Sequence, residues 1–434
     1  MRIAGSGPEV FPAFHRGRYL LHCPEAGASA LINRQFFDVL ERAKEGEADA
    51  EQQALSELRA WGLTEQRLGM LSRKGPDPEP TELTLALTGR CNLRCTYCYA
   101  EGGEDRQVMS LATARVALEF VTGNALRRRE SGITLHLHGG GEITTVWDRL
   151  GEIVHLAREL TAEADLGLRL TAGTNGVMPA DRARTLAGWL DEVTVSMDGT
   201  RDVHDRQRPR AGGGGSLEDV TRTLRIFDAE RVSYGVRMTV TSESVDRLPE
   251  SVSEVCRVCQ AKVIQVEPAA PLGRFIDRTP VDAAAFVRAF REARRLAAEA
   301  GRELRYSGAR PWVVTDVFCK AVEGALCITP RGRLTACYEA QDDPDGPFHF
   351  GHVDISGKRL AMDHQRREAL LRFGGRHQVE CTECIARFHC AGDCPMKRDA
   401  EGNSPRCEIN RGLTLDLILE GLLDRESEDC ARSA

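Results

Sequence analysis

Three cysteines lie close together in the stretch CNLRCTYC, at positions Cys91, Cys95 and Cys98. A disulfide needs two thiols, and a closed tetrahedral zinc site needs four ligands. A 4Fe–4S cluster also normally takes four protein ligands, so three thiolates from one loop would leave one iron without a protein ligand. An open position on a metal is typical of a catalytic site. The spacing therefore predicts a cluster whose free iron binds a small bidentate molecule.

A second group of cysteines lies in the C-terminal part of the chain. Its eight members are Cys319, Cys327, Cys337, Cys381, Cys384, Cys390, Cys394 and Cys407. Eight thiolates are the number that two fully ligated 4Fe–4S clusters need. Zinc is the alternative, because CxxC pairs are common in zinc sites. Cys256 and Cys259 share one face of a predicted helix, where ordinary packing is the simpler interpretation.

The composition limits the partners and the location of the protein. The chain has 434 residues and a formal net charge of -7. This length predicts two or three domains, and the charge gives no reason to expect a nucleic-acid partner. No apolar stretch reaches transmembrane length, and the start MRIAGSGPEVFPAF lacks a signal-peptide core. We therefore expect a soluble, cytoplasmic protein with no membrane partner, in which clustered cysteines favour metal or redox chemistry over disulfides.

The first 75 residues have the pattern of a small α+β module. Strands are expected in FPAFHRGRYLLHC (11–23), and helical spacing is present in RQFFDVLERAKEG (34–46) and EQQALSELRAWGL (51–63). The charged, proline-rich stretch RKGPDPEPTE (73–82) predicts a linker.

After this linker, strands and helices alternate six times. The predicted strands are 82–88, 133–138, 166–174, 192–198, 234–240 and 262–268. The predicted helices are 111–129, one that starts at Val146, 182–190, one that starts at Leu217, one that starts at Val245, and 283–300. Such alternation implies an α/β fold with a parallel sheet and helices outside it. The sheet is expected to be open or to form a partial (βα)6 TIM-like barrel, in which the C-terminal ends of the strands carry the active site. From about residue 301 a loop-rich, cysteine-rich domain is expected.

Two further features have simpler interpretations than catalysis. His204 and Asp205 could form an acid–base pair, but a solvated pair in a loop is the preferred interpretation. The run AGGGGS (211–216) lacks the Lys-Ser/Thr ending of a phosphate-binding loop, so it is expected to be a flexible loop.

The loop with Cys91, Cys95 and Cys98, with an aromatic residue before the third cysteine, resembles the cluster loop of radical S-adenosylmethionine (radical SAM) enzymes. In that family the open iron binds the amino and carboxylate groups of S-adenosylmethionine. Electron transfer from the cluster then cleaves the cofactor and yields a 5′-deoxyadenosyl radical, which abstracts a hydrogen atom from the substrate. The protein supplies positioning and excludes water.

Other motifs agree with this resemblance, which covers roughly residues 80 to 410. HGGGE is similar to the family's GGEP segment, with Ile143 in place of the usual proline. The residues that the resemblance assigns to cofactor binding are Tyr97 beside the adenine, Gly140, Gly141 and Glu142 at the amino group, and Asn175, Ser196 and Arg237 at the ribose and carboxylate. Glu267 ends a predicted strand, and it either faces this site or caps the next turn.

The C-terminal cysteines resemble the SPASM extension of radical enzymes that modify peptides and proteins. By this resemblance, a first auxiliary 4Fe–4S cluster has the ligands Cys319, Cys327, Cys337 and Cys394, and a second has Cys381, Cys384, Cys390 and Cys407. The N-terminal module is loosely similar to PqqD-like elements, which bind a leader peptide at a sheet edge. The expected domains are thus a peptide-recognition module (1–75), a radical SAM core (80–300) and a SPASM domain (301–434).

The leading hypothesis is a peptide maturase that forms a thioether, carbon–carbon or carbon–oxygen crosslink in a ribosomally made precursor with a leader segment. It would use S-adenosylmethionine, three 4Fe–4S clusters and an external one-electron reductant of the flavodoxin or ferredoxin type. The alternative enzyme resembles anaerobic sulfatase-maturing enzymes, which make formylglycine and carry an aspartate where this chain has Tyr338 and Glu339. Those two residues are the candidate catalytic groups. The alternative from another class is a non-catalytic iron–sulfur electron carrier or peptide-binding scaffold.

Overall fold

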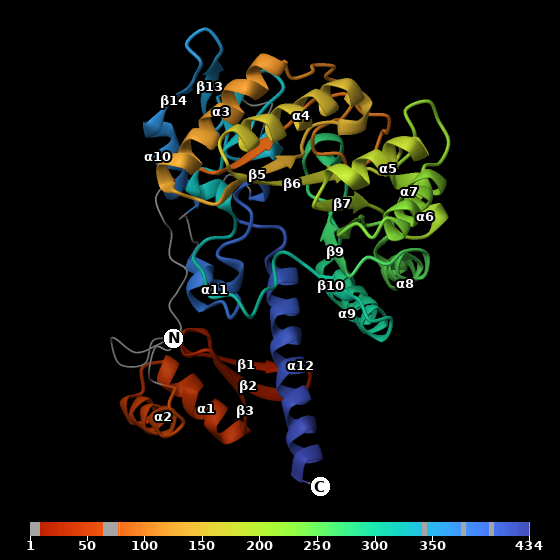
Figure 1. Cartoon of the computed structure of the whole chain (residues 1–434). Coiled ribbons are helices and arrows are strands. Elements are labelled where there is room, and N and C mark those ends of the chain that lie inside the picture. The colour runs from red at the N-terminus through yellow and green to blue at the C-terminus, as the bar shows by residue number, and fades with distance from the viewer. Residues whose placement is uncertain are drawn as a thin grey trace. The chain divides into compact units, whose positions relative to one another are not determined.

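The computed structural model describes residues 9–63, 77, 79–340, 345–374, 379–398 and 403–433 (Figure 1). Half of the predicted linker at 73–82 lies outside them. The chain forms two compact units. Unit 1 comprises Met1–Arg73, Gly308–Phe318 and Gly374–Ala434, and unit 2 comprises Lys74–Ser307 and Cys319–Phe373. The expected division at 1–75, 80–300 and 301–434 stays a prediction, because compactness alone does not show what each part does.

A single sheet organises unit 2. Among the described residues it has eleven strands, in the order β10-β9-β8-β7-β6-β5-β4-β11-β12-β13-β14. The strands are β4 (Glu82–Leu85), β5 (Gly132–Leu137), β6 (Gly167–Thr174), β7 (Glu192–Ser196), β8 (Tyr234–Val240), β9 (Val263–Pro268), β10 (Glu303–Arg305), β11 (Cys327–Ile328), β12 (Arg333–Thr335), β13 (His349–Asp354) and β14 (Arg359–Met362). The strands from β10 to β11 run parallel, and β12 to β14 continue the sheet antiparallel.

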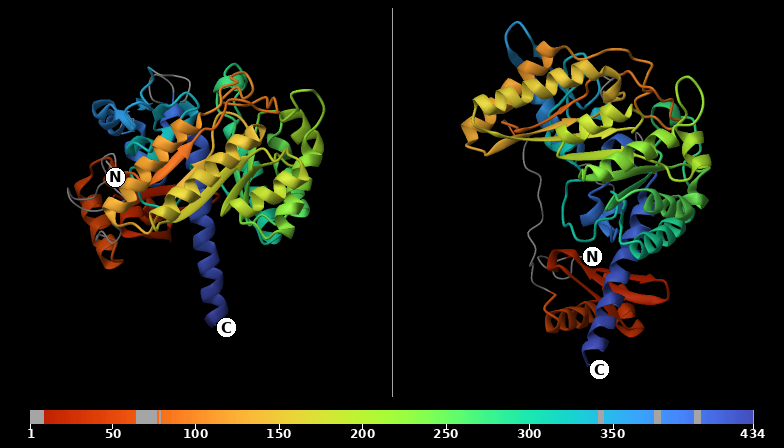
Figure 2. Two further views of the ribbon diagram at one scale, coloured as in Figure 1. Left: turned by 45° about the horizontal axis from the view of Figure 1, so that its top comes forward. Right: turned by 45° about the vertical axis from the view of Figure 1, so that its right-hand side comes forward.

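The helices of unit 2 cover the outer side of the curved sheet (Figure 2). They are α3 (Leu111–Arg128), α4 (Trp147–Glu163), α5 (Ala180–Trp189), α6 (Arg201–Gln207), α7 (Leu217–Ala229), α8 (Leu248–Val258), α9 (Ala283–Glu299) and α10 (His364–Gly374). Strand–helix alternation with a parallel sheet confirms the predicted α/β fold class. Among the described residues, no helix combines the length and the hydropathy that crossing a membrane requires.

The two faces of the parallel strands differ in polarity. Along β5 and its continuation, Leu135 and Leu137 are buried, whereas His136 and His138 on the opposite face are half-buried. Along β6, Leu170 and Ala172 are buried in the same way. Both faces of a parallel sheet are usually apolar. The inner face here keeps polar side chains, so it can serve as a binding surface.

Unit 1 contains a three-stranded antiparallel sheet, β1 (Phe11–His15), β2 (Arg18–Cys23) and β3 (Ala28–Ile32), with β2 in the middle. Its helices are α1 (Arg34–Lys44), α2 (Ala48–Ala60), α11 (Arg387–Cys390) and α12 (Cys407–Ser433), and α12 contacts β1 and β3 (Figure 1). Leu21 packs with α1 and α2, while its neighbour Leu20 packs with Phe388 and Ile418. Neighbouring residues of a strand point to opposite faces, so the sheet has an N-terminal core on one face and a core shared with the C-terminal part of the chain on the other.

The prediction of a solvated loop at His204 and Asp205 is wrong. Both residues lie on α6, and His204 is fully buried. Its Nδ1 accepts from the backbone N–H of Asp198 at 3.2 Å, and its Nε2 is 3.0 Å from the Ser216 hydroxyl. Burial lowers the pKa of His204 to about 3. The carboxylate of Asp205 accepts from the N–H of Ser216 at 2.8 Å, which caps the start of α7.

Candidate functional site

The loop with the three cysteines follows β4. The backbone N–H of Leu93 donates to Cys91 Sγ at 3.4 Å, and the N–H of Gly102 donates to Cys98 Sγ at 3.3 Å. Burial raises the pKa of Cys91 to about 12, and the nearby thiols of Cys95 and Cys98 add to this effect. The three sulfurs therefore lie near one another, with amide donors of the kind that stabilise cluster sulfur.

These thiols fit a cluster by their type and grouping. In the described part of the chain, no three His, Cys, Asp or Glu side chains surround the position of one metal ion. A 4Fe–4S cluster offers a separate iron to each cysteine, so its ligands need not meet at one point. Cys91, Cys95 and Cys98 remain the predicted ligands of the radical SAM cluster.

The glycines of HGGGE bring a second loop against the cysteine loop. The N–H of Gly141 donates to Thr88 O, and the N–H of Glu142 donates to Arg90 O, each at 2.7 Å. A Cβ on Gly141 would lie 1.9 Å from Arg90 O, so only glycine fits there. The carbonyl oxygen of Gly140 lies beside Gly102, which itself contacts Cys91 and Cys98. The predicted cofactor segment thus adjoins the cysteine loop.

The carboxylate of Glu142 joins the ends of β5 and β6. It is 3% exposed and accepts from the N–H of Asn175 at 2.7 Å, from the Thr174 hydroxyl at 2.9 Å and from the N–H of Thr144 at 3.1 Å. Burial raises its pKa, and these hydrogen bonds oppose the shift. Its carboxylate positions Asn175, while a direct contact between Glu142 and the cofactor stays a prediction.

Asn175 connects β6 to the cysteine loop. Its Nδ2 donates to Asn92 Oδ1 at 2.8 Å and lies 3.8 Å from Cys91 Sγ. The side chain of Asn92 donates in turn to Val177 O at 2.8 Å. Asn175 therefore lies beside the cysteine loop, and its role at the cofactor stays a prediction.

Tyr97 belongs to a buried polar network that the sequence did not reveal. Its hydroxyl donates to Asp198 Oδ2 at 2.6 Å and accepts from the guanidinium of Arg208. Asp198 also accepts from Gln207 Nε2 at 2.9 Å and from the N–H of Thr239 at 3.1 Å. Asp198 lies two residues after the end of β7, and this place near a strand end was the available signal. Arg208 carried no comparable signal.

Ser196, Arg237 and Glu267 come from neighbouring strands. Ser196 lies opposite Arg237, and Thr239 lies opposite Glu267. Glu267 accepts from the N–H of Ser307 at 3.0 Å and from its hydroxyl at 2.9 Å, so it bonds the turn after β10 and not the turn that follows its own strand. Burial alone would lower the pKa of Arg237, but the charge of Glu267 raises it above its ordinary value. Glu267 is thus close enough to interact with Arg237, and its predicted role at the cofactor stays a prediction.

Tyr338 and Glu339 lie on a short 3-10 turn, Tyr338–Ala340. The ring of Tyr338 lies 4.5 Å from that of His138 and 6.1 Å from that of Tyr99, between ring centroids. Burial lowers the pKa of His138 to about 4, with a further contribution from Arg237, so this imidazole is neutral at pH 7. Glu339 is close enough to add to the raised pKa of Tyr99. The candidate catalytic residues thus face the same inner surface as Arg237.

The second group of cysteines is divided between the units. Cys319, Cys327 and Cys337 belong to unit 2, and the other five belong to unit 1. Burial raises the pKa of Cys327 to about 12, and the nearby Cys319 contributes. In unit 1, Cys390 Sγ accepts from Asn410 Nδ2 at 3.2 Å.

Within unit 1, the four predicted ligands of the second auxiliary cluster lie near one another. Burial raises the pKa of Cys390, and Cys384 and Cys407 contribute. The pKa of Cys407 is raised by burial as well, with contributions from Cys381 and Cys384. The grouping is compatible with the predicted cluster, which stays a prediction, as does the first auxiliary cluster with Cys394.

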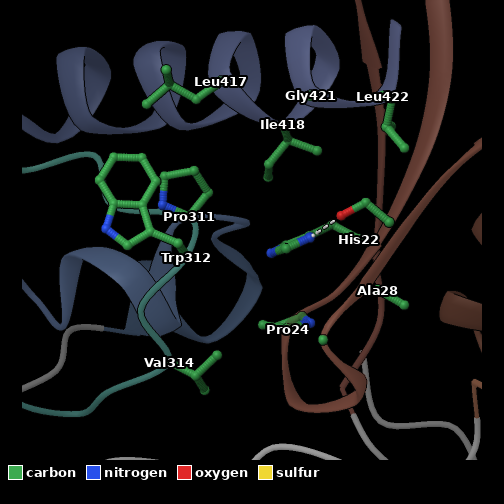
Figure 3. A pocket seen from close by; sticks show the side chains of 12 residues that line it. His22, Pro24, Ala28, Pro311, Trp312, Val314, Leu417, Ile418, Gly421 and Leu422 are labelled. Atoms are coloured by element: carbon green, nitrogen blue, oxygen red, sulfur yellow. Dashed lines mark hydrogen bonds between the residues drawn. The ribbon is translucent and has the colours of Figure 1, made fainter. Parts of the chain in front are cut away.

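Unit 1 also contains a cavity of about 280 Å³ beside β3 (Figure 3). Its lining includes Trp312, Leu417, Ile418 and Leu422. His22 lies at its edge and forms a 2.7 Å hydrogen bond with the Ser29 hydroxyl.

The donor and the acceptor can be assigned for each hydrogen bond of the two histidines at this cavity. His389 Nδ1 lies 2.7 Å from Val313 O, and a carbonyl only accepts, so that nitrogen carries the proton. His22 Nε2 then donates to His389 Nε2 at 2.7 Å, and Ser29 donates to His22. Burial lowers the pKa of His22 to about 3, so both rings are satisfied while neutral.

Residues 85–255 match the model of the Radical SAM superfamily. The chain contains a radical SAM domain. Its cysteine loop, its glycine-rich segment and the four parallel strands from β5 to β8 lie inside the matched region. The predicted resemblance to radical SAM enzymes is confirmed.

Curated relatives match this domain. The chain is 26% identical to a cysteine-type anaerobic sulfatase-maturating enzyme of Clostridium novyi, over 37% of the chain and 44% of the relative. It is 25% identical to the sporulation killing factor maturation protein SkfB of Bacillus subtilis, over 45% of the chain and 44% of the relative. The match thus spans less than half of the length of each relative.

Solved structures share the fold over more of the chain. The structure of anSMEcpe with bound AdoMet has a TM-score of 0.63 at 16% identity, and the similarity covers 79% of this chain and 99% of that one. SuiB of Streptococcus suis bound to its precursor peptide SuiA has a TM-score of 0.51 at 12% identity, covering 89% and 94%. At these identities the similarity shows the fold.

We predict that Gly141→Ala disrupts the contact between the two loops. The new methyl group would meet Arg90 O, so the backbone must shift, at a cost of about 1–3 kcal/mol in the free energy of unfolding. Chemical denaturation and iron analysis of the anaerobically reconstituted protein measure this effect. Gly188→Ala on α5 is the control, because a Cβ there meets nothing within 4 Å. Equal stability and iron content in the two variants would contradict the prediction.

Proposed function

We propose that this protein is a radical SAM enzyme that crosslinks a ribosomally made precursor peptide. The observation that carries the proposal is the group of three half-buried thiols in the loop after β4, beside the glycine-rich segment and Asn175. The fold shared with anSMEcpe and SuiB supports it. A simple electron carrier has no need for a cluster in which one iron lacks a protein ligand.

Cys91, Cys95 and Cys98 would hold a 4Fe–4S cluster, with Gly140, Gly141, Asn175, Ser196 and Arg237 around its cofactor. When bound, the cluster and S-adenosylmethionine supply a radical that removes a hydrogen atom from the substrate. The remaining tasks belong to the chain. The inner face orients the peptide, and the apolar outer face with its helices excludes water from that side.

The residues around Tyr338 are placed to act on the peptide. Its ring packs on neutral His138, so it offers a flat surface for a substrate side chain. We assign Glu339 as the group that accepts a proton when the crosslink forms, and one auxiliary cluster as the acceptor of the spare electron. An external reductant of the flavodoxin or ferredoxin type would supply electrons to the radical SAM cluster.

Unit 1 offers a surface for the leader segment of the precursor. Among the described residues, β3 pairs only with β2, so its other edge can accept an extended peptide. Ala28 and Ser29 of β3 line the cavity of Figure 3, and Trp312 beside them is 64% exposed. A peptide paired with β3 could therefore place one apolar side chain in this cavity.

Formylglycine formation is the second candidate, because the fold of anSMEcpe covers most of the chain. The Tyr338–Glu339 pair in place of the expected aspartate disfavours it. The two functions differ in product mass when the modified residue is a cysteine, whereas formylglycine formed from a serine also removes two hydrogens and is recognised by its reactive aldehyde. A crosslink removes two hydrogens from the peptide, whereas formylglycine formation from cysteine removes its sulfur.

The first test of the proposal is the mass of a co-expressed peptide. Short reading frames beside the gene are expressed one by one with the enzyme under anaerobic conditions, and each peptide is analysed by intact mass. We expect one peptide to lose two hydrogens per event, and thiol alkylation distinguishes a thioether from other crosslinks. The variant without Cys91, Cys95 and Cys98 is the control. Sulfur loss would support formylglycine formation, and unchanged mass for every peptide would contradict the proposal.

The iron content tests the number of clusters. Three 4Fe–4S clusters predict ~12 irons per chain after anaerobic reconstitution. Replacing Cys91, Cys95 and Cys98 with alanine should remove about a third of the iron and all formation of 5′-deoxyadenosine. Cys256→Ala on α8 is the matched control and should keep all of the iron. Loss of all iron from the triple variant would show that the clusters do not assemble independently.

The substitution Trp312→Ala tests whether the leader segment binds at this surface. Once a modified peptide is known, Trp312→Ala should weaken its binding at least about tenfold, because exposed tryptophans at cavities often dominate binding energy. Fluorescence anisotropy with the labelled leader measures the affinity. Trp61→Ala is the control in the same unit, since this tryptophan is also half-exposed but lies outside the cavity. Equal affinities for both variants would place the leader elsewhere.

A further inference from the structure

The cysteine loop pairs with the last residue of α6 and the segment that follows it. The N–H of Arg94 donates to Pro209 O at 2.8 Å, and the N–H of Thr96 donates to Gln207 O at 2.9 Å. Leu93 and Arg210 form an antiparallel bridge. In this register, Cys95 lies directly opposite Arg208. Opposite residues of an antiparallel pair point to the same face, with Cβ atoms about 4.5–5.5 Å apart.

Arg208 is a buried cation held in one place. It is 6% exposed, and its guanidinium donates to the Tyr97 hydroxyl and lies 4.0 Å from Asp198. Its Nε has no hydrogen-bond partner among the described residues. The carboxylate of Asp198 is shared with Tyr97, Gln207 and the backbone of Thr239. Burying a charge is costly unless it is paired, so the site favours a further negative charge near Arg208.

Cys95 would supply that charge as a thiolate. A thiolate ligand of an iron–sulfur cluster carries negative charge, and the cluster gains one more when it is reduced. A fixed positive charge in a buried site acts strongly on both, because screening by water is weak there.

We propose that Arg208 is a positioning residue that holds its charge beside the Cys95 sulfur and thereby raises the reduction potential of the radical SAM cluster. This inference rests on the proposed function, because it requires a cluster on Cys91, Cys95 and Cys98. In the reduction step the oxidised cluster takes one electron from an external low-potential donor, and no bond or proton changes place. Tyr97 and Asp198 hold the guanidinium in position for this step.

Redox titration of the full-length, reconstituted protein tests the proposal. Dithionite is the reductant, mediators set the potential, and EPR measures the reduced fraction. The radical SAM cluster is identified by the change in its signal when S-adenosylmethionine is added to a parallel sample. At a fixed potential, we expect Arg208→Gln to lower the ratio of reduced to oxidised cluster about tenfold, which corresponds to ~59 mV for one electron. Arg208→Lys should stay close to the wild-type ratio.

Asp198→Asn should shift the reduction potential in the opposite direction from Arg208→Gln. This change removes a negative charge beside Arg208 while keeping the shape of the side chain. The ratio of reduced to oxidised cluster should therefore rise at a fixed potential. This variant decides the question if Arg208→Gln does not assemble its cluster.

The possible outcomes separate the inference from the proposed function. An unchanged potential in Arg208→Gln with its cluster intact would limit Arg208 to a structural role and overturn the inference. A potential that falls equally in Arg208→Lys, or fails to rise in Asp198→Asn, would also overturn it. A wild-type protein with no EPR signal that responds to S-adenosylmethionine would instead refute the proposed function itself.

Discussion

The site depends on the hydrogen bonding of one short loop. The backbone of the cysteine loop is bonded to the segment after α6, and the neighbouring residues Thr88 and Arg90 accept from the glycine-rich loop. Asn92 is bonded to the end of β6. Because buried amides must find partners, these contacts fix where the three thiols lie. The ends of β4, β5, β6 and β7 are thereby tied to one another through the loop that would hold the cluster.

The polar inner face of the sheet explains why so many ionisable groups lie near this loop. Arg237 and Glu267 balance each other's charge across neighbouring strands, and Asp198 partly balances Arg208. His138 stays neutral beside the cationic Arg237. Burial makes each of these charges costly if it stands alone. The site therefore combines fixed charges in pairs, which can orient a charged cofactor without large movements of the protein.

The sequence predicted the repeating part of the fold well. Strand β8 occupies Tyr234–Val240, as predicted, and helix α3 ends within one residue of its predicted boundary. Periodic burial determines such elements, and periodicity is visible in the sequence. The same approach missed α6, since its seven residues include several charged side chains and too few turns to show a pattern. It also missed Arg208, whose role depends on the register between two loops rather than on any motif.

The division of the chain into units could not be read from the sequence either, because unit 1 is assembled from three separate segments. Residues that line or border its cavity are next to both the predicted peptide surface and the predicted ligands of the second auxiliary cluster. His389, which bonds His22 beside β3, is adjacent to Cys390, and α12, which lines the cavity with Leu417 and Ile418, begins at Cys407. A cluster held by these cysteines would stabilise α11 and α12 by fixing their ends. The same ligands would then maintain the cavity in which the peptide is proposed to bind, so cluster assembly and peptide binding would depend on one folded unit.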